Sequence, residues 1–187
     1  MNCPSCNSEI DILTDKLFYC HTCNKIFEYK SVNYDYLLNI VETCKDVKQD
    51  EKYHPEGDVL THLLQTYNRA YKESKNYDLV LAALLHDVGK QITRLRHDKE
   101  SVKLIEGFVS EKTLWLIKHH MRIWSFISGE MKKYQKVQDY YNHKWFKDLI
   151  MLARWDKMSR NPNVKVEFNK DKIIKQLKGL NKYETNI

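Results

Sequence analysis

The sequence predicts a mostly α-helical protein in which a helical bundle follows a small cysteine-rich β module. From about Asn33 onward, apolar residues recur with a period near 3.6, as they do on the buried face of a helix. The 187 residues include only 5 glycines and 3 prolines, too few for the many tight turns of an all-β fold. Two Cys-x-x-Cys pairs lie in the first thirty residues. We therefore divide the chain into a module of residues 1–31 and a helical domain of residues 32–187.

The cysteine-rich module contains the pairs CPSC and CHTC. Each pair forms a turn in which two thiolates converge, and two such turns can complete a tetrahedral zinc site. Strand-like residues at 17–19 and 27–29 predict a short hairpin around the second pair, and the whole pattern resembles the small zinc ribbons. The expected zinc ligands are Cys3, Cys6, Cys20 and Cys23.

Two disulfides, or a redox-active Cys-x-x-Cys, are the alternatives for this module. Nothing in the sequence suggests an oxidising compartment, and no βαβ pattern surrounds either pair. A site with four sulfur ligands has no open coordination position, so its zinc would be structural. Metal binding would then supply the folding free energy that so small a core lacks.

The helical domain is expected to contain eight helices, each with one apolar face. The fifth cysteine, Cys44, shares such a face with Leu37, Ile40 and Val41, so we expect it to be inert packing. The predicted helices span residues 33–48, 57–74, 77–90, 98–109, 111–126, 127–139, 144–159 and 170–179.

Three of these helices place His or Asp at the end of an apolar stripe. His86 follows Leu79, Ala82 and Ala83 at helical spacing in the segment AALLHDVGK, and Asp87 comes directly after it. An unpaired buried carboxylate costs several kcal/mol, so it needs a partner or a cation.

Asp156 ends such a stripe on a second helix, and His119 and His120 follow one on a third. His62 lies on one helix face with Asp58, four residues earlier. Each residue alone fits an ordinary core histidine or a solvated aspartate. Together they indicate imidazole and carboxylate ligands that converge on a metal site inside a helical bundle.

This ordered set of residues resembles the HD-domain metal-dependent phosphohydrolases. The resemblance covers roughly residues 50 to 162, and it includes the extended doublet HDVGK and the segment ARWDKMSRNP. It implies an all-helical HD-domain bundle after the ribbon. The residues that match the family pattern are His62, His86, Asp87, His97, His119, His120 and Asp156.

A finer likeness is to the HD domains of bacterial CCA-adding tRNA nucleotidyltransferases and of HD–polynucleotide kinase fusions. The segments HPEGDVLTHLL at 54–64 and KHHMR at 118–122 resemble theirs. The segment RHDKESVKL departs from their Gly-His-Glu-Lys, because Arg96 replaces the Gly and Asp98 replaces the Glu. The resemblance extends to the hydrolase part of those relatives alone.

The histidine count resembles that of the two-metal members of the family. The resemblance implies that Asp87 bridges two ions. His62, His86 and Asp156 would hold the first ion, with Asp58 as an additional candidate, and the second would bind His97, His119 and His120. Mixed His and carboxylate ligation suits one or two ions of Mn, Fe, Co, Ni or Zn better than Mg alone.

Several basic and polar residues are expected around the metal site. Lys90 is placed to bind a phosphoryl oxygen and is, with Asp87, a candidate catalytic residue. Arg122 and Arg160 are candidate substrate clamps. The residues expected to frame the pocket are His54, Glu56 and Lys157.

The preferred hypothesis for function is a phosphohydrolase that acts on phosphate esters of nucleotides or RNA ends, with 2′,3′-cyclic phosphodiesterase and phosphatase activity. One alternative is a nucleotidase or nucleoside triphosphate hydrolase that acts on free nucleotides. Another is a non-catalytic module that binds a nucleotide or a nucleic acid. The complete ligand set favours the enzyme.

Charge and targeting signals add little to this hypothesis. The net charge of +6 is compatible with phosphate-bearing partners but does not establish nucleic-acid binding. The ribbon and a lysine-rich C-terminal segment favour a polymer substrate, although that segment also reads as an amphipathic helix. We expect a cytoplasmic protein without membrane contact, because no secretory leader or long apolar run is present.

Overall fold

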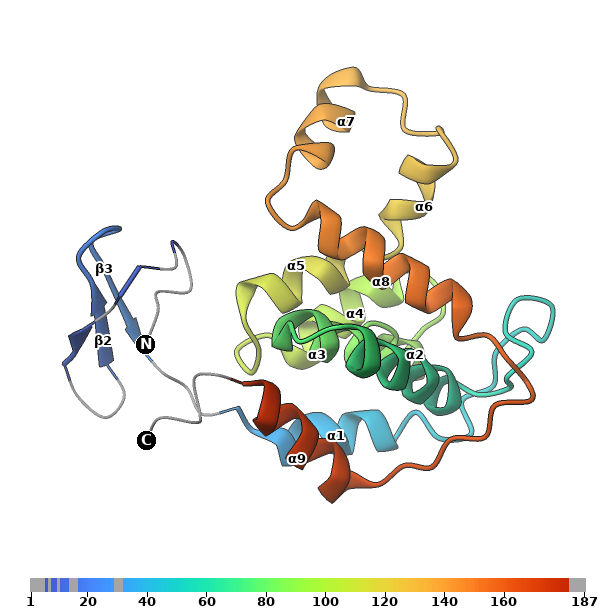
Figure 1. Cartoon of the computed structure of the whole chain (residues 1–187). Helices are drawn as coiled ribbons and strands as arrows, with labels where there is room; N and C mark the ends of the chain where they lie inside the picture. The colour runs from blue at the N-terminus through green and yellow to red at the C-terminus, as the bar shows by residue number, and fades with distance from the viewer. Residues whose placement is uncertain (1–5, 7, 10, 14–16, 29–31, 182–187) are drawn as a thin grey trace.

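The computed structural model describes residues 6, 8–9, 11–13, 17–28 and 32–181. This part of the chain folds as a small antiparallel sheet and a larger body of helices (Figure 1). The predicted fold class is confirmed. None of the helices in the described ranges is long and apolar enough to span a bilayer.

The sheet has three strands in the order β1-β2-β3: β1 (Asp11–Ile12), β2 (Leu17–Cys20) and β3 (Lys25–Glu28). Strands β2 and β3 form the predicted hairpin, in which Phe18 lies opposite Phe27. The turn between them contains Asn24, whose φ of 51° lies in the left-handed region that Asn tolerates better than most residues. Cys3 and Tyr29 lie outside the described residues.

The centre of the helical body is α3 (Tyr77–Leu85), in which every residue from Leu79 to Leu85 is at most 3% exposed. A helix that is apolar on all sides has to be surrounded by other helices. Those that pack on it are α1 (Tyr34–Glu42), α2 (Val59–Glu73), α5 (Glu111–His119), α8 (Phe146–Met158) and α9 (Lys170–Leu180). Burial of each Leu side chain contributes roughly 1.5–3 kcal/mol. The His-Asp doublet at the end of α3 is therefore carried into the middle of the protein.

The structure corrects several predicted helix boundaries. The predicted helix 33–48 ends at Glu42, and 77–90 divides into α3 and a short 3-10 helix, η1 (Val88–Gln91). The predicted helix 111–126 breaks at His120 and Met121, so that α6 (Arg122–Ile127) is separate, and 127–139 becomes α7 (Tyr134–Tyr141). The remaining helix is α4 (His97–Ile105). Some of these breaks occur where a side chain is needed at the site described below.

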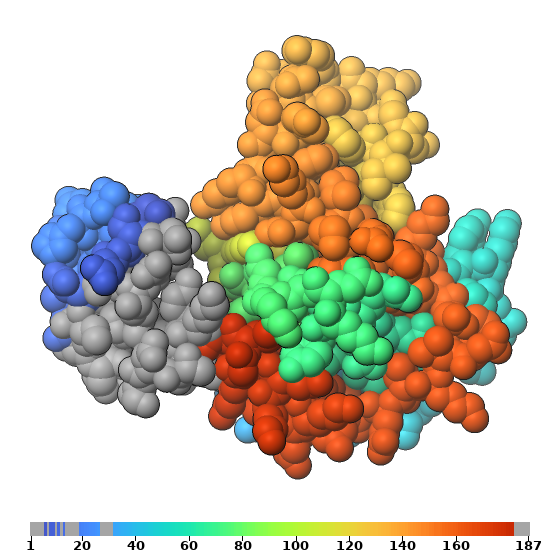
Figure 2. Space-filling model, in the orientation of Figure 1, coloured from blue at the N-terminus to red at the C-terminus, as the bar shows by residue number. Residues whose placement is uncertain are grey.

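Two outer parts of the fold matter for function. Residues 121–145, which include α6 and α7, form an arm that projects from the helical body (Figures 1 and 2). Helix α9 buries Ile173 and Leu177 against the body, so the lysine-rich segment is an amphipathic helix, as the alternative reading predicted. Cys44 is fully buried, as expected for packing.

Candidate metal centre

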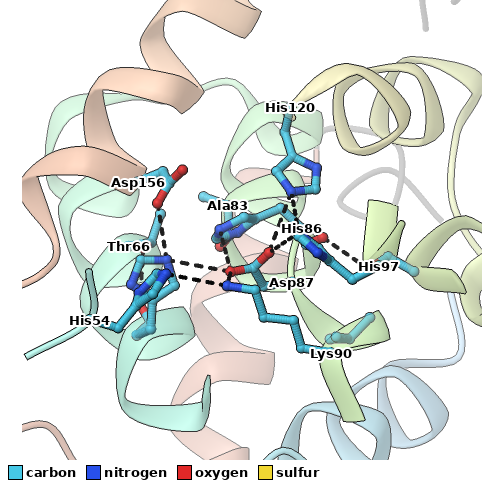
Figure 3. Close-up of polar contacts among 12 residues, drawn as sticks. His54, Thr66, Ala83, His86, Asp87, Lys90, His97, His120 and Asp156 are labelled. Carbon is cyan, nitrogen blue, oxygen red and sulfur yellow. Dashed lines mark hydrogen bonds and ion pairs between the residues drawn. The ribbon is translucent and has the colours of Figure 1, made fainter. Parts of the chain in front are cut away.

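Six side chains from six different elements meet at the inner ends of their helices (Figure 3). His86 ends α3 and Asp87 begins η1, while His97 is the first residue of α4. Each of the six side chains belongs to a residue that is at most 5% exposed. The six residues are His62, His86, Asp87, His97, His120 and Asp156.

The six residues form two triads. In the first, His62, His86 and Asp156 each offer one donor atom, and these atoms lie within 4.8 Å of one another. His62 Nε2 is 3.2 Å from Asp156 Oδ1. In the second triad, which consists of Asp87, His97 and His120, the donor atoms also lie within 4.8 Å of one another.

Asp87 faces both triads with different oxygens. Its Oδ1 is 2.9 Å from His97 Nε2 and 3.3 Å from His120 Nε2. Its Oδ2 is 3.5 Å from His86 Nε2 and 3.7 Å from His62 Nε2. This is the arrangement that a carboxylate needs in order to bridge two cations.

Backbone carbonyl groups fix the orientation of three of the imidazoles. Nδ1 of His86 lies 3.1 Å from the carbonyl oxygen of Ala83, that of His97 lies 2.9 Å from Arg94 O, and that of His120 lies 2.6 Å from Ile117 O. A neutral imidazole that donates from Nδ1 has its lone pair on Nε2. All three Nε2 atoms therefore point into the cluster as potential ligands.

A buried cation would satisfy this donor set. His97 Nε2 and His120 Nε2 are only 3.1 Å apart and both face Asp87, so a proton or a metal ion has to lie between them. His86 Nε2 is buried without a hydrogen-bond partner. Burial is the main reason that the pKa of His86 falls to about 3, which keeps this imidazole neutral and ready to bind a metal. The residues present fit one or two transition-metal ions.

The contacts within the site also determine the charges of Asp87 and His62. Burial acts against ionisation of Asp87, but the positive charge of Lys90 and hydrogen bonds from His120 and His97 hold the pKa of Asp87 well below its usual range. Burial also acts against protonation of His62. Hydrogen bonds to Asp156 and Glu56 outweigh that effect and raise the pKa of His62 to about 9. In the metal-free form, His62 therefore carries a proton in place of a metal ion.

Glu56 contacts a histidine of the metal centre, whereas the sequence predicted only that it frames the pocket. Its side chain is fully buried, and Oε1 lies 2.7 Å from His62 Nδ1 and 2.9 Å from His54 Nδ1. One carboxylate thus holds two imidazoles, one at the first triad and one at the pocket. The sequence signal for this contact is the segment HPEG, which places an acidic residue between His54 and the helix that bears His62.

A pocket of about 530 Å³ opens onto the metal centre. Lys90 lies in its wall, where Nζ is 2.6 Å from Asp87 Oδ2 and donates to Gln49 Oε1 at 2.7 Å. Arg160 also lines the pocket and donates from Nη2 to Asp156 Oδ1 at 2.9 Å. The remaining charged or aromatic lining residues include Lys48, Tyr53, His54, Arg94, Trp124 and Lys157.

Three of the expected site residues lie elsewhere. His119 packs its ring against Trp115 and Tyr140, away from both triads. Asp58 caps α2 by accepting a hydrogen bond from Thr61 N at 2.7 Å. Arg122 lies over the ring of Tyr140 and does not line the pocket.

The close approach of η1 and α4 brings His97 to Asp87. A Cβ atom at Gly89 would lie 2.2 Å from the carbonyl oxygen of His97 and 2.5 Å from Ser101 N, so only glycine fits. Ser101 Oγ accepts from Gly89 N and donates to His86 O. The glycine in HDVGK thus allows His97 to reach the carboxylate next to His86.

Comparison with known proteins identifies the family. The model of the HD domain matches residues 59–160, more than half of the chain. The chain belongs to the HD-domain family. This membership implies a divalent metal in the active site and a metal-dependent phosphohydrolase, and the two triads are a matching cluster of His and Asp.

The chain is also similar to proteins named "Multifunctional CCA protein". That of Methylobacillus flagellatus is 30% identical over 112 residues, which are 51% of this chain and 27% of the relative. The protein of Herminiimonas arsenicoxydans is 36% identical over 77 residues, 37% of this chain and 19% of the relative. That of Acinetobacter baumannii is 25% identical over 114 residues, 52% and 28% of the two chains. The chain therefore matches only 19–28% of the length of these curated relatives.

Proposed function

We propose that this HD site holds two divalent ions and hydrolyses phosphate esters of nucleotides or RNA ends, with 2′,3′-cyclic phosphates as the best substrates. The observation that carries the proposal is the position of Asp87, whose two oxygens face separate triads. In two-metal sites a pair of ions about 3.5–4 Å apart stabilises both the attacking and the leaving oxygen.

The metal ions would lower the pKa of a bound water and neutralise the charge of the phosphoryl group. The protein itself would orient the ester. Lys90, held by Gln49 and Asp87, presents a positive charge at the pocket side of the bridging carboxylate. Arg160 is fixed by Asp156 and offers its remaining N–H groups to a phosphoryl oxygen. Both cations line the pocket, each beside a carboxylate of the site, and would bind the phosphate there.

The preference for nucleotides or RNA ends rests on the resemblance of HPEGDVLTHLL and KHHMR to the HD domains of CCA-adding enzymes. The similarity to multifunctional CCA proteins agrees with it. Tyr53 and Trp124 in the pocket wall offer flat apolar faces on which a base could stack. The pocket volume also suits a free nucleotide, and the substrate test has to separate the two.

The test is an assay of protein loaded with Mn, Co or Ni against 2′,3′-cyclic, 2′- and 3′-nucleotides, nucleoside triphosphates and RNA with defined ends. We expect ring opening or phosphate release from the cyclic and monoester substrates. Asp87→Ala should abolish turnover, because both ions lose a ligand. His119→Gln, a change in the adjacent histidine that faces away, should retain it.

Two results would contradict the proposal. One is the absence of hydrolysis across the whole panel when both ions are bound, which would favour a binding module. The other is near-normal turnover by Asp87→Ala with full metal content. Triphosphates as the preferred substrates would shift the assignment to a nucleotidase.

A further inference from the structure

The pocket has room for about one nucleotide, so a longer substrate has to lie on the surface outside it. Its volume of about 530 Å³ is typical of sites for a single small molecule. Met121 and Trp124, at the base of the arm formed by residues 121–145, are part of the pocket wall. The arm therefore continues directly from the edge of the pocket to the projecting part of the protein (Figure 2).

Some of the aromatic residues of the arm form its own interior. The ring of Tyr140 packs against Phe126 and Phe146, and only 6% of this residue is exposed. The rings that make these contacts form the core of the arm. Two rings on α7 remain largely exposed, although that of Tyr141 also contacts Phe146, with ring centroids 5.4 Å apart.

Tyr134 is 76% exposed and Tyr141 is 58% exposed. The two residues are seven positions apart on α7, so they lie on the same helix face about 10 Å from each other. Exposed aromatic rings in a row are the surfaces on which the bases of single-stranded nucleic acids stack, with roughly 1–3 kcal/mol per base.

The arm also carries a concentrated positive charge. It has five basic and two acidic residues, so 25 of the 187 residues hold half of the net charge of +6. Within the described part of the chain, Lys132, Lys133 and Lys136 form no ion pair with a carboxylate. The basic residues of the arm are Arg122, Lys132, Lys133, Lys136 and Lys144.

We propose that the arm is a docking surface for single-stranded RNA whose terminal nucleotide occupies the pocket. The proposal rests on the proposed function, since it assigns a polymer to the same site. Lysines contact the phosphate groups, and Tyr134 and Tyr141 stack with bases. An acidic peptide would satisfy the lysines alone and would leave the exposed faces of the two tyrosines uncovered.

The experiment compares two triple variants that change the charge by the same amount. In the arm variant, Lys132→Glu, Lys133→Glu and Lys136→Glu reverse three exposed lysines. In the control, Lys165→Glu, Lys172→Glu and Lys175→Glu do so on and before α9. A third variant combines Tyr134→Ala with Tyr141→Ala. Binding of a fluorescent single-stranded RNA is measured over a range of salt concentrations, together with hydrolysis of a cyclic mononucleotide.

We expect the arm variant to bind RNA at least about tenfold more weakly than the control variant. The slope of log K against log salt should fall by about 2, since each lost phosphate contact to a single strand contributes about 0.7. The tyrosine variant should also bind more weakly but keep its salt slope. Mononucleotide turnover should stay unchanged in all three, because none of these residues lines the pocket.

Equal RNA affinity of the arm and control variants would overturn the proposal, and so would tighter binding of poly-glutamate than of RNA. The binding measurement does not depend on catalysis. Failure of the proposed function would appear separately, as wild-type protein that binds RNA on the arm but hydrolyses no ester.

Discussion

Glu56 illustrates how a single buried carboxylate can hold the imidazoles of a metal site. Its Oε1 lies 2.7 Å from Nδ1 of His62 and 2.9 Å from Nδ1 of His54, and its Oε2 is buried without a hydrogen-bond partner. Hydrogen bonds from His54 and His62 outweigh burial and lower the pKa of Glu56 to about 2, so the group is ionised at neutral pH. A negative charge close to the Nδ1–H group of His62 makes its Nε2 a stronger metal ligand.

Glu56→Gln should therefore weaken metal binding by about 10–100-fold, the usual effect of losing such a partner. Titration of metal-free protein with Co or Mn, followed by calorimetry or by the absorption of bound Co, measures the change. Glu73→Gln is the matched control, because Glu73 accepts a hydrogen bond from Trp155 Nε1 and neither residue lines the pocket. Unchanged affinity in Glu56→Gln would remove Glu56 from the metal centre.

The doublet His119-His120 shows why some of the site residues could not be chosen from the sequence. Successive residues on a helix point about 100° apart, so only one of the two can face Asp87. The structure places His120 there and turns His119 toward Trp115. By contrast, His86 and Asp156 each follow an apolar stripe at helical spacing, and that pattern fixes the direction of their side chains. The sequence does not fix the role of Asp58, since a position just before an apolar run fits a helix cap as well as a metal ligand.

At the scale of elements, helix centres followed from periodicity and helix ends did not. Helix α3 was evident from its apolar run, but η1 depends on contacts between Gly89 and α4 that no local pattern reveals. The break between α5 and α6 at His120 likewise follows a tertiary demand, because His120 has to direct Nε2 to Asp87. The sheet was predictable because short strands flank a Cys-x-x-Cys turn.

The ribbon element remains a proposed zinc site. The Sγ atoms of Cys6, Cys20 and Cys23 lie within 4.8 Å of one another, and the fourth expected ligand, Cys3, lies outside the described residues. Cys3→Ser combined with Cys20→Ser should remove about one equivalent of zinc while the helical circular dichroism signal largely persists. Elemental analysis of purified protein gives the zinc content. The same zinc content in the double variant and the wild type would rule out this site.

For the whole molecule, the stability of the fold is coupled to metal binding, because the metal centre is built from six separate elements. Without cations, the body keeps two carboxylates and four imidazoles together at its centre. An ion that binds only the folded state stabilises it by about 4 kcal/mol at a thousandfold excess over Kd. Added Mn, Co or Ni should therefore raise the Tm of protein that is metal-free at the helical site but still zinc-loaded at the ribbon.

This increase in Tm should depend on pH in a definite direction. The pKa of His62 rises from 6.5 to about 9 in the folded metal-free protein, so its protonated form adds stability that is complete below pH 6.5 and disappears as the pH rises through 9. A metal ion at Nε2 has to displace that proton, and this costs less as the pH rises. The metal-induced increase in Tm, measured by calorimetry, should therefore be larger at about pH 8.5 than at about pH 6.5. Replacing His86 and Asp87 together with Ala should remove the increase at both pH values, and an increase that survives would place the ion elsewhere.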